Sequence, residues 1–444
     1  MTYIDDILQQ TVPENPGQVT FHQAVREVLM GIVPAVQKYE TLYRRQALLE
    51  RLTRPERLIR FRVSWEDDRG NLQVNTGWRV QWNGALGPYK GGLRFHPSVT
   101  TGTMQFLAFE QTFKNALTGL PLGGGKGGSD FDPKGKSDGE IGRFCRSFMT
   151  QLYRFIGPYR DVPAGDIGVG QRELGYLFGQ YRALTGAFPA GAITGKGLSW
   201  GGCPGRGEAT GYGLLYLTQS LLQDHGMEIE GKRVAVSGAG NVALHAMEKA
   251  VQLGAIPVTC SDSTGWLLDM DGLDTAYIKE IKSRRQPLEA YTDLYPKATF
   301  QRNRDLWQTP CDIALPCATE NELTLSDARV LTQNGCKALC EGANMPCTRE
   351  AAHHFLLSGT LYCPGKAANA GGVAVSGIEM QQNARHCVFP FAKTDALLKG
   401  IMENIYRAIC QAAKEFDREG DLLSGANIAG FLKVADAMLA QGCI

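Results

Sequence analysis

The sequence lacks the long apolar runs, the charge excess and the cysteine spacing that mark several large protein classes. No stretch of about 18 apolar residues occurs, and the first residues, MTYIDDILQQ, are acidic, so neither a membrane span nor a targeting segment is predicted. The formal net charge of +1 gives no general attraction to nucleic acid or to anionic membranes. The 12 cysteines include no Cys-x-x-Cys, which is typical of reduced, buried thiols. We therefore expect a cytoplasmic protein without a metal site.

A P-loop and a hydrolase serine are also missing. A P-loop has a glycine six residues before its lysine and Ser or Thr after it, whereas Lys126 has Leu120 and Gly127 at those positions. Residues 197–201 match Gly-x-Ser-x-Gly, but glycine and proline follow where a helix is required. We therefore predict neither activity, and we interpret Gly195–Gly207 as the connection between two domains.

The chain is long enough for two domains. It has 444 residues, of which 43% are hydrophobic and 20% charged, and this length exceeds that of a usual single domain. The 53 glycines exceed the usual share of roughly 7%, and many of them lie in a few motifs.

Three lysines occur within one glycine-rich segment, residues 87–128. A helix predicted over residues 103–117 is apolar on most of its turns and is therefore buried, and Gln111 and Lys114 share one of its faces. An unpaired buried charge is costly, so a bound carboxylate would stabilise it. With Lys90 before this helix and Lys126 after it, the segment predicts an anion site.

Lys126 lies among five glycines in the run Leu122-Gly-Gly-Gly-Lys-Gly-Gly128. Glycine lets the backbone approach a ligand closely and take positive φ, which favours a ligand site here. The alternative is a solvated lysine on a glycine-rich loop, which is the commoner situation for a lysine considered alone. A later acid, Asp166, on a loop predicted over residues 161–170, favours the ligand site.

The other elements predicted in the first half are structural. Alternating apolar residues over 59–65 and 72–82, around a turn at 68–71, predict a hairpin. The capping-box spacing of Thr20 and Gln23 predicts the start of a helix that continues to Ile32. Residues 141–155 also show helical spacing.

The second half contains a predicted dinucleotide-binding unit. A strand over 233–237 leads into Gly238-Ala-Gly-Asn-Val-Ala243, which opens a helix, and a second strand follows over 257–262. Asp262 fits the acidic position of this pattern, although a structural tight turn is the alternative. Short strands over 312–316 and 338–341 alternate with helices, so the fold class is α/β with a doubly wound sheet.

Motifs along nearly the whole chain resemble the hexameric, NADP-dependent glutamate dehydrogenases. They include GPYKGGLRFHP, DVPAGDIGVG, GKGLSWGG, EATGYG, PCATENEL, EGANMP and PGKAANAGGVAVSG. The resemblance implies reversible conversion of L-glutamate to 2-oxoglutarate and ammonium. It also implies an α/β substrate and oligomerisation domain over 1–200, a Rossmann-type domain over 201–424, and a final helix over 425–444 that returns to the first domain. A final helix that belongs to the second domain is equally compatible with the residues themselves.

The resemblance further implies a role for individual residues. Lys126 is the acid/base, and Asp166 and the Gly165 carbonyl face the amino group. Lys90 and Ser376 hold the side-chain carboxylate, and Gln111 and Lys114 hold the α-carboxylate. The implied cofactor-binding residues are Thr210, Gly238, Gly240, Asn241, Val242, Ser261, Asp262, Ser263, Lys282, Asn344 and Asn369. For Asn344 and Asn369, local turn formation is the alternative.

NADP, not NAD, is the predicted cofactor. Ser261 and Ser263 flank Asp262 with hydroxyls that can donate to a phosphate, and Lys282, Arg284 and Arg285 follow on a helical stretch. A solvated basic helix face is the alternative for each of these cations. A dehydrogenase of another amino acid and a non-catalytic dinucleotide-binding regulator remain alternative functions.

The chemistry requires Lys126 to lose its proton near neutral pH. An isolated lysine has a pKa near 10.4, and burial beside the like charges of Lys90 and Lys114 should lower it. The predicted partners are small-molecule substrates and further copies of the chain in a hexamer, with no nucleic acid and no membrane.

Overall fold

The computed structural model describes residues 2–303 and 305–442, which form two compact units. The first unit comprises Met1–Arg206, Val373–Thr394 and Asn427–Ile444, and the second comprises Gly207–Gly372 and Asp395–Ala426. The predicted ranges 1–200 and 201–424 differ from these units chiefly at Val373–Thr394, which packs with the first unit. The α/β fold class is confirmed, because each unit contains a five-stranded sheet with helices against it.

The first unit is built on a mixed sheet with the order β1-β2-β4-β3-β5. Its strands are β1 (Arg57–Glu66), β2 (Leu72–Asn83), β3 (Tyr89–Phe95), β4 (Gly123–Ser129) and β5 (Asp161–Gly165). β1 and β2 form the predicted antiparallel hairpin, and β3 pairs in parallel with both β4 and β5. The predicted loop over 161–170 is wrong in its first half, because Asp161–Gly165 pairs with β3 as a strand.

Helices surround this sheet. They are α1 (Tyr3–Glu14), α2 (Val19–Gly31), α3 (Val33–Lys38), α4 (Glu40–Arg45), α5 (Leu48–Leu52), α6 (Thr101–Leu117), α7 (Asp138–Leu152) and α8 (Gln171–Thr185), with most of α16 (Gly371–Ala384) and α18 (Leu422–Gln441). α6 is the predicted buried helix and packs on β4 and β2. The α7 side chains Phe144 and Phe148 pack against Phe95 of β3.

Two helix starts differ from the prediction. Thr20 is not an N-cap, because α2 already begins at Val19 and its N-cap residue Gln18 makes no capping hydrogen bond through its side chain. α7 begins at Asp138, before the predicted residue 141, and it has a complete capping box formed by Ser137 and Glu140.

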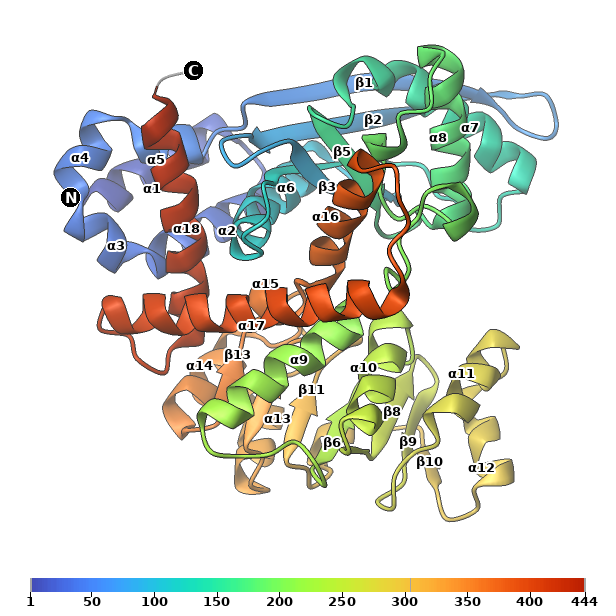
Figure 1. The fold of residues 1–444 in the computed structure, drawn as a ribbon, viewed down its shortest axis with the longest axis vertical. Coiled ribbons are helices and arrows are strands. Elements are labelled where there is room, and N and C mark those ends of the chain that lie inside the picture. The colour runs from blue at the N-terminus through green and yellow to red at the C-terminus, as the bar shows by residue number, and fades with distance from the viewer. Residues whose placement is uncertain (1, 304, 443–444) are drawn as a thin grey trace. The chain divides into compact units, whose positions relative to one another are not determined.

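α18 runs beside α5 (Figure 1), and its Phe431 packs edge-on against Tyr43 with ring centroids 5.6 Å apart.

Arg79 of β2 passes close to two of the five glycines of β4. Its guanidinium reaches across the sheet to Asp161 at the start of β5, where both side chains are fully buried in a bidentate ion pair. On the way, Nη1 donates to the Gly91 carbonyl at 3.0 Å. A Cβ at Gly127 would lie 3.0 Å from Arg79 Cδ, and a Cβ at Gly125 would lie 3.4 Å from its Nη2. A side chain at Gly127 would therefore crowd Arg79, whereas one at Gly125 would first meet the Val80 carbonyl oxygen at 3.1 Å.

The glycines of β4 are needed for space and not for unusual backbone angles. All five lie within the strand, and none has positive φ, so the prediction of positive φ in this run is wrong. The predicted alternative of a solvated lysine on a loop is also wrong, because β4 is buried over its whole length.

Replacement of Gly128 by alanine is expected to lower the melting temperature, because the new Cβ would lie 2.1 Å from the Arg94 carbonyl oxygen. Overpacking of this kind typically costs about 1–3 kcal/mol. The matched control is Gly179→Ala on α8, where a Cβ meets no atom within 4 Å and where alanine favours the helix. Thermal unfolding followed by circular dichroism measures both. A Gly128→Ala variant as stable as the control would contradict the steric account of β4.

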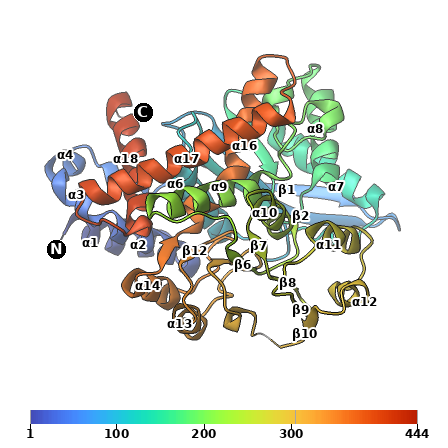
Figure 2. The same cartoon turned by 60° about the horizontal axis from the view of Figure 1, so that its bottom comes forward.

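The second unit is built on a parallel sheet with the order β13-β12-β11-β6-β7. Its strands are β6 (Arg233–Val236), β7 (Ile256–Pro257), β11 (Ile313–Leu315), β12 (Ala338–Cys340) and β13 (Leu361–Cys363). Its helices are α9 (Ala209–Asp224), α10 (Asn241–Gln252), α11 (Thr275–Ser283), α12 (Tyr291–Leu294), α13 (Leu325–Gln333), α14 (Arg349–Ser358), α15 (Gly365–Ala368) and most of α17 (Phe391–Glu415). α9 and α10 lie side by side (Figure 2). The predicted strand, turn and helix after residue 233 are confirmed.

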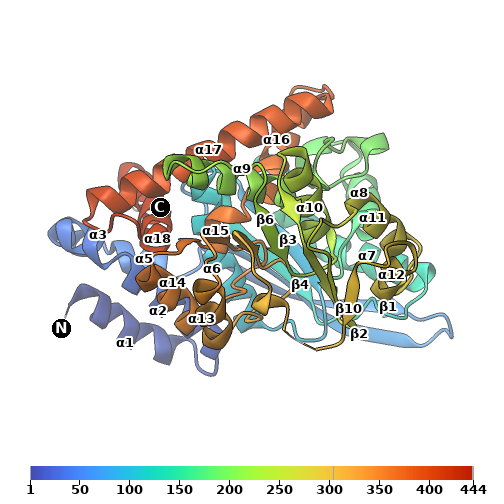
Figure 3. The same ribbon diagram turned by 90° about the horizontal axis from the view of Figure 1, so that it is seen from below.

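The strand predicted over 257–262 is divided between two sheets. Ile256–Pro257 is β7 and pairs with β6, whereas β8 (Thr259–Asp262) joins β9 (Gly265–Leu268) and β10 (Thr299–Gln301) in an antiparallel sheet. α11 and α12 lie next to this small sheet (Figure 3). Asp262 therefore ends a strand that has left the parallel sheet.

Residues 2–303 and 305–442 include one long apolar helix and no cluster of metal-ligating side chains. By length and composition one helix, α18, is apolar enough to cross a membrane, and 61% of its apolar window is buried. Within these described ranges no group of three His, Cys, Asp or Glu side chains is placed to hold a metal ion.

Candidate functional site

Lys126 and Asp166 meet in the first unit. The Lys126 Nζ atom, on β4, lies 3.1 Å from one oxygen of Asp166, which directly follows β5. Arg94 of β3 holds the other oxygen at 2.7 Å through Nε. One carboxylate is therefore shared by two cations, and β3, β4 and β5 each contribute one member of the cluster.

The electrostatics of this cluster follow from burial. Burial lowers the pKa of Lys126 and Arg94 adds to this effect, whereas Asp166 opposes them. Burial alone would raise the pKa of Asp166, but the charges of Lys126 and Arg94 outweigh burial and hold it below its usual value. The predicted direction for Lys126 agrees with these surroundings, although the like charges that act on it are those of Arg94 and Arg79.

Lys90 and Ser376 are brought together through Arg206. Lys90 is 1% exposed, and burial together with the charges of Arg206 and Arg79 lowers its pKa well below the ordinary value. Arg206 donates from Nε to Ser376 Oγ at 3.2 Å. Two cations and a hydroxyl thus gather in the first unit, with Ser376 on α16. Such a group suits a carboxylate.

Gln111 and Lys114 share a face of α6, as predicted. Burial, together with the charge of Lys126, lowers the pKa of Lys114 to about 8. Gln111 donates through Nε2 to Asn115 Oδ1 at 2.7 Å. Gln111 and Lys114 form a second candidate site for a carboxylate. Because the charge of Lys126 lowers the pKa of Lys114, this second site is close enough to Lys126 to interact with it electrostatically.

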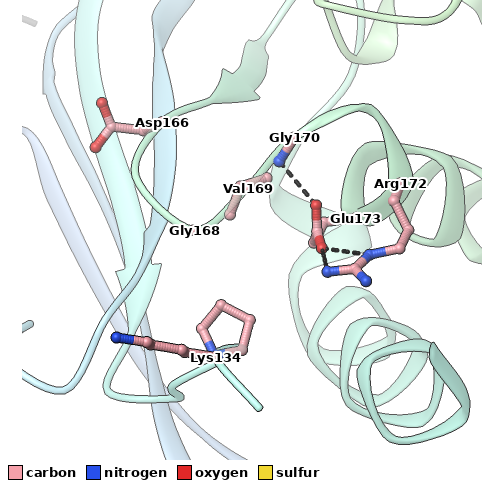
Figure 4. Close-up of a pocket in the computed structure, with 8 residues that line it drawn as sticks. Lys134, Asp166, Gly168, Val169, Gly170, Arg172 and Glu173 are labelled. Atoms are coloured by element: carbon pink, nitrogen blue, oxygen red, sulfur yellow. Dashed lines mark hydrogen bonds and ion pairs between the residues drawn. The ribbon is translucent and has the colours of Figure 1, made fainter. Parts of the chain in front are cut away.

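Gly165 ends β5, and its carbonyl is packed closely against β3. A Cβ at Gly92 would lie 2.8 Å from the Gly165 oxygen and equally close to Asp166 Cβ, so this position accepts only glycine without a backbone shift. Asp166 also lines a pocket of about 420 Å³ (Figure 4). Its wall includes Lys134 and Glu173, whose carboxylate is held by the Gly170 amide and by Arg172.

In the second unit, the glycine turn opens α10 as predicted. Gly238 has φ of +86°, which favours glycine, and Gly240 is the N-cap of the helix. A Cβ at Gly240 would meet no protein atom within 4 Å, so the space before the helix amides is open. Asn241 and Val242 form the first turn, and Thr210 lies in the first turn of α9. The open N-terminus of α10 fits a pyrophosphate.

Two of the predicted phosphate-recognition residues, Ser261 and Lys282, contact other residues of the predicted cofactor site. Lys282 of α11 places Nζ 2.9 Å from Asp262 Oδ2, and the Gly238 amide donates to Ser261 Oγ at 2.7 Å. Ser263 is exposed. Burial acts to raise the pKa of Asp262, but hydrogen bonds from Thr264 and Lys282 outweigh burial and lower it. Arg284 pairs with Glu280 on its own helix instead.

Asn344 and Asn369 form a second polar group in this unit. Asn369 donates through Nδ2 to the Ala343 carbonyl and to Asn344 Oδ1, both at 3.0 Å. Its own Oδ1 is buried and has no hydrogen-bond partner in the described structure. An unpaired buried acceptor is costly, so a ligand that donates to it would stabilise the site. These two hydrogen bonds join positions 26 and 25 residues apart and are not those of a local turn, and they leave the Asn369 oxygen for a donor group of a ligand.

Reasoning from the sequence missed Arg94, Arg206 and Asn115. Arg94 stands between two buried apolar residues of β3, which signals a polar group on the opposite face of a strand. Arg206 follows a glycine-rich run and carries no periodic signal. Asn115 lies four residues after Gln111, at the spacing where two amides can pair on a helix.

The chain was compared with known proteins. Residues 55–183 match a family model described as Glu/Leu/Phe/Val dehydrogenase, dimerisation domain, and residues 201–442 match one described as Glutamate/Leucine/Phenylalanine/Valine dehydrogenase. The NADP-specific glutamate dehydrogenase of Salmonella typhi is 54% identical over 99% of each chain. The NAD-specific glutamate dehydrogenase of Bacteroides fragilis is 49% identical over 99% of this chain and 100% of its own. The crystal structure of Plasmodium falciparum glutamate dehydrogenase matches with a TM-score of 0.96 and 46% identity, over 99% of this chain and 95% of that one.

Proposed function

We propose, because this chain belongs to the Glu/Leu/Phe/Val dehydrogenase family, that it catalyses the reversible oxidative deamination of L-glutamate to 2-oxoglutarate and ammonium with NADP(H). The observation that carries the proposal lies in the first unit. There, two cationic groups suited to carboxylates accompany a buried lysine–aspartate pair. A dicarboxylic amino acid requires both cationic groups.

Recognition of the substrate follows from these groups. Lys90 and Ser376, with Arg206 beside them, bind the side-chain carboxylate, and Gln111 and Lys114 bind the α-carboxylate. Each bound carboxylate restores a counter-charge to buried cations whose pKa values are lowered without one. The gain in electrostatic stability therefore favours substrates with two carboxylates over those with one.

Lys126 and Asp166 carry the proton transfers. In the direction of amination, Lys126 donates to the keto oxygen of 2-oxoglutarate and helps it leave as water. Asp166, which its low pKa keeps ionised, holds the entering ammonium with the Gly165 carbonyl and receives protons from it. The deprotonated nitrogen bonds to the keto carbon, the oxygen then leaves that carbon as water, and the product of these steps is a 2-imino acid. Bound NADPH supplies the hydride that Cα of this imino acid accepts.

The residues of the second unit fit a dinucleotide. Gly238, Gly240, Asn241 and Val242 would hold the pyrophosphate at the start of α10, and the unpaired Asn369 oxygen would accept from the nicotinamide amide. Ser261, Ser263 and Lys282 would bind the 2′-phosphate beside Asp262. Thr210 and Asn344 complete the proposed set.

Steady-state kinetics with both cofactors at fixed glutamate should favour NADP by at least about tenfold in kcat/KM, since one charge-assisted hydrogen bond is worth roughly that factor. Lys282→Ala should lower kcat/KM for NADP and leave that for NAD nearly unchanged. Arg284→Ala is the matched control, because Arg284 pairs with Glu280 and is 63% exposed. Equal use of the two cofactors by the unchanged protein would refute the proposed binding of the 2′-phosphate by Ser261, Ser263 and Lys282.

The decisive test of the function is cofactor reduction with a panel of amino acids. A dehydrogenase of leucine or valine would prefer apolar substrates, and a non-catalytic dinucleotide-binding regulator would reduce no cofactor with any of them. Cofactor reduction that is faster with glutamate than with any apolar amino acid of the panel excludes both alternatives.

Residues 55–183 match the dimerisation domain of the family, so the chain forms an oligomer. We propose that this oligomer is a hexamer. β1 is an edge strand of the first sheet, and the exposed apolar residues Leu72 and Val74 lie on the neighbouring β2, which supports assembly through this region. Light scattering coupled to gel filtration gives the number of copies. A cytoplasmic location is a prediction from the sequence.

A further inference from the structure

Asn115 is a fully buried amide at the centre of the first unit's site, and the proposed chemistry assigns it no role. It lies on α6, four residues after Gln111 and one after Lys114, with 0% of its surface exposed. Its Oδ1 accepts from Gln111 Nε2 at 2.7 Å. Its Nδ2 donates to the Lys90 carbonyl at 3.0 Å and to the Gly123 carbonyl at 2.6 Å. Both donor hydrogens and the acceptor of this amide are therefore used.

These contacts tie three elements together at one point. Lys90 belongs to β3 and Gly123 begins β4, and the two strands are in register there, with Lys90 opposite Gly124. The same amide fixes α6 over this point. The backbone from which the Lys90 side chain leaves the sheet is thus held at a set position relative to Gln111.

Asn115 also fixes the orientation of the Gln111 amide. A glutamine Nε2 carries two hydrogens, and Asn115 accepts one of them. The other hydrogen remains for an α-carboxylate. Without the acceptor on Asn115, the Gln111 side chain would be free to rotate about its last torsion, which is broad for an amide.

We propose that Asn115 is a positioning residue that sets the separation of the two carboxylate-binding groups and so selects a five-carbon substrate. One group contains Gln111 and Lys114, and the other contains Lys90 and Ser376. The inference rests on the proposed function, because it takes the assignment of these two groups to the two carboxylates as given. Aspartate is one methylene shorter than glutamate and 2-aminoadipate is one longer, so both would leave one carboxylate misplaced.

The size of the effect follows from the general worth of a methylene in a fitted site. One methylene changes kcat/KM by about 10–200-fold when the site is rigid. A site whose two ends are no longer held at a fixed separation accommodates the wrong length more easily. Loss of Asn115 should therefore reduce discrimination by chain length, in addition to any loss of rate.

The test uses two substitutions of different severity. Asn115→Leu removes all three hydrogen bonds with a side chain of similar shape but larger volume, and it leaves two buried carbonyls unpaired, so it can prevent folding. Asn115→Ser is smaller and leaves room for water, so it decides the question if the leucine variant does not fold. The matched control is Thr112→Val, also on α6, where the buried hydroxyl bonds only to the Ala108 carbonyl of its own helix.

The measurement is kcat/KM with NADP for L-aspartate, L-glutamate and L-2-aminoadipate. In either Asn115 variant the preference for glutamate over the other two should fall by at least about tenfold, with KM for NADP unchanged, while Thr112→Val keeps the original preference. A preference within about twofold of the original in an active Asn115 variant would overturn this inference alone, even if kcat had fallen. An unchanged protein that is inactive with glutamate would overturn the proposed function and this inference with it.

Discussion

Replacement of Lys126 by alanine is expected to abolish turnover and to leave NADP binding measurable. The reason is that Lys126 lies against Asp166 on β4, in the first unit, where it acts on the substrate's oxygen and makes no proposed contact with the cofactor phosphates. Loss of a general acid/base costs about 10²–10⁴-fold in rate, and the loss should be larger here because Asp166 then loses one of its two cations. Stopped-flow turnover and fluorescence titration of NADPH measure the two effects separately.

Asp166→Asn should behave in the same way, because the neutral amide neither holds ammonium nor accepts a proton. The control for the lysine variant is Lys136→Ala, which removes an exposed lysine of the loop after β4 that lies over the Trp65 ring. Near-normal kcat in the Lys126 or Asp166 variant would remove the proposed mechanism. Loss of NADPH binding in the Lys126 variant would show that its role had been assigned to the wrong ligand.

The double variant Lys90→Leu with Ser376→Val should lose glutamate activity by orders of magnitude in kcat/KM and gain some activity with apolar amino acids. A buried, hydrogen-bonded charge pair broken on one side costs about 2–5 kcal/mol, or roughly 30- to 4000-fold. The same loss should appear in KM for 2-oxoglutarate in the reverse direction. Undiminished glutamate activity would refute the assignment of the side-chain carboxylate to Lys90.

Arg206 predicts a refinement of this result. It donates to Ser376 and its charge remains in the double variant, so an apolar side chain would still meet a buried cation. Adding Arg206→Met should therefore raise activity with leucine or norvaline further, while glutamate activity falls again. An Arg206→Met addition without effect on either substrate would show that this guanidinium does not face the substrate.

The sequence predicts most helices and strands correctly, but it predicts less well where a strand begins and ends and which sheet it joins. The hairpin, the buried helix α6 and the glycine turn before α10 carry strong local signals, and all three are confirmed. β5 was predicted as a loop because its Pro163 and Gly165 are typical loop residues, yet pairing with the buried β3 overrides that preference. The strand after α10 divides between two sheets at Val258, which no periodicity reveals.

A residue of the site could be predicted from the sequence only where it lies in a recognisable motif and its side chain suits the proposed chemistry. Lys90, Lys114 and Lys126 meet both conditions. Arg206 and Asn115 do not, because their significance arises from contacts with residues far away in sequence: Ser376 for the first, Lys90 and Gly123 for the second. Contacts of this kind appear only when the chain is folded.

The passage of Arg79 behind β4 has a consequence for how this family can vary. Because a Cβ at Gly127 would lie 3.0 Å from Arg79 Cδ, a side chain at this position would disturb an arginine that is held in a fully buried ion pair with Asp161. A relative that keeps this ion pair should therefore keep the glycine at position 127. Aligned sequences of the family would then show the arginine of β2 and the aspartate of β5 kept together, although β4 and β3 lie between these two strands in the sheet.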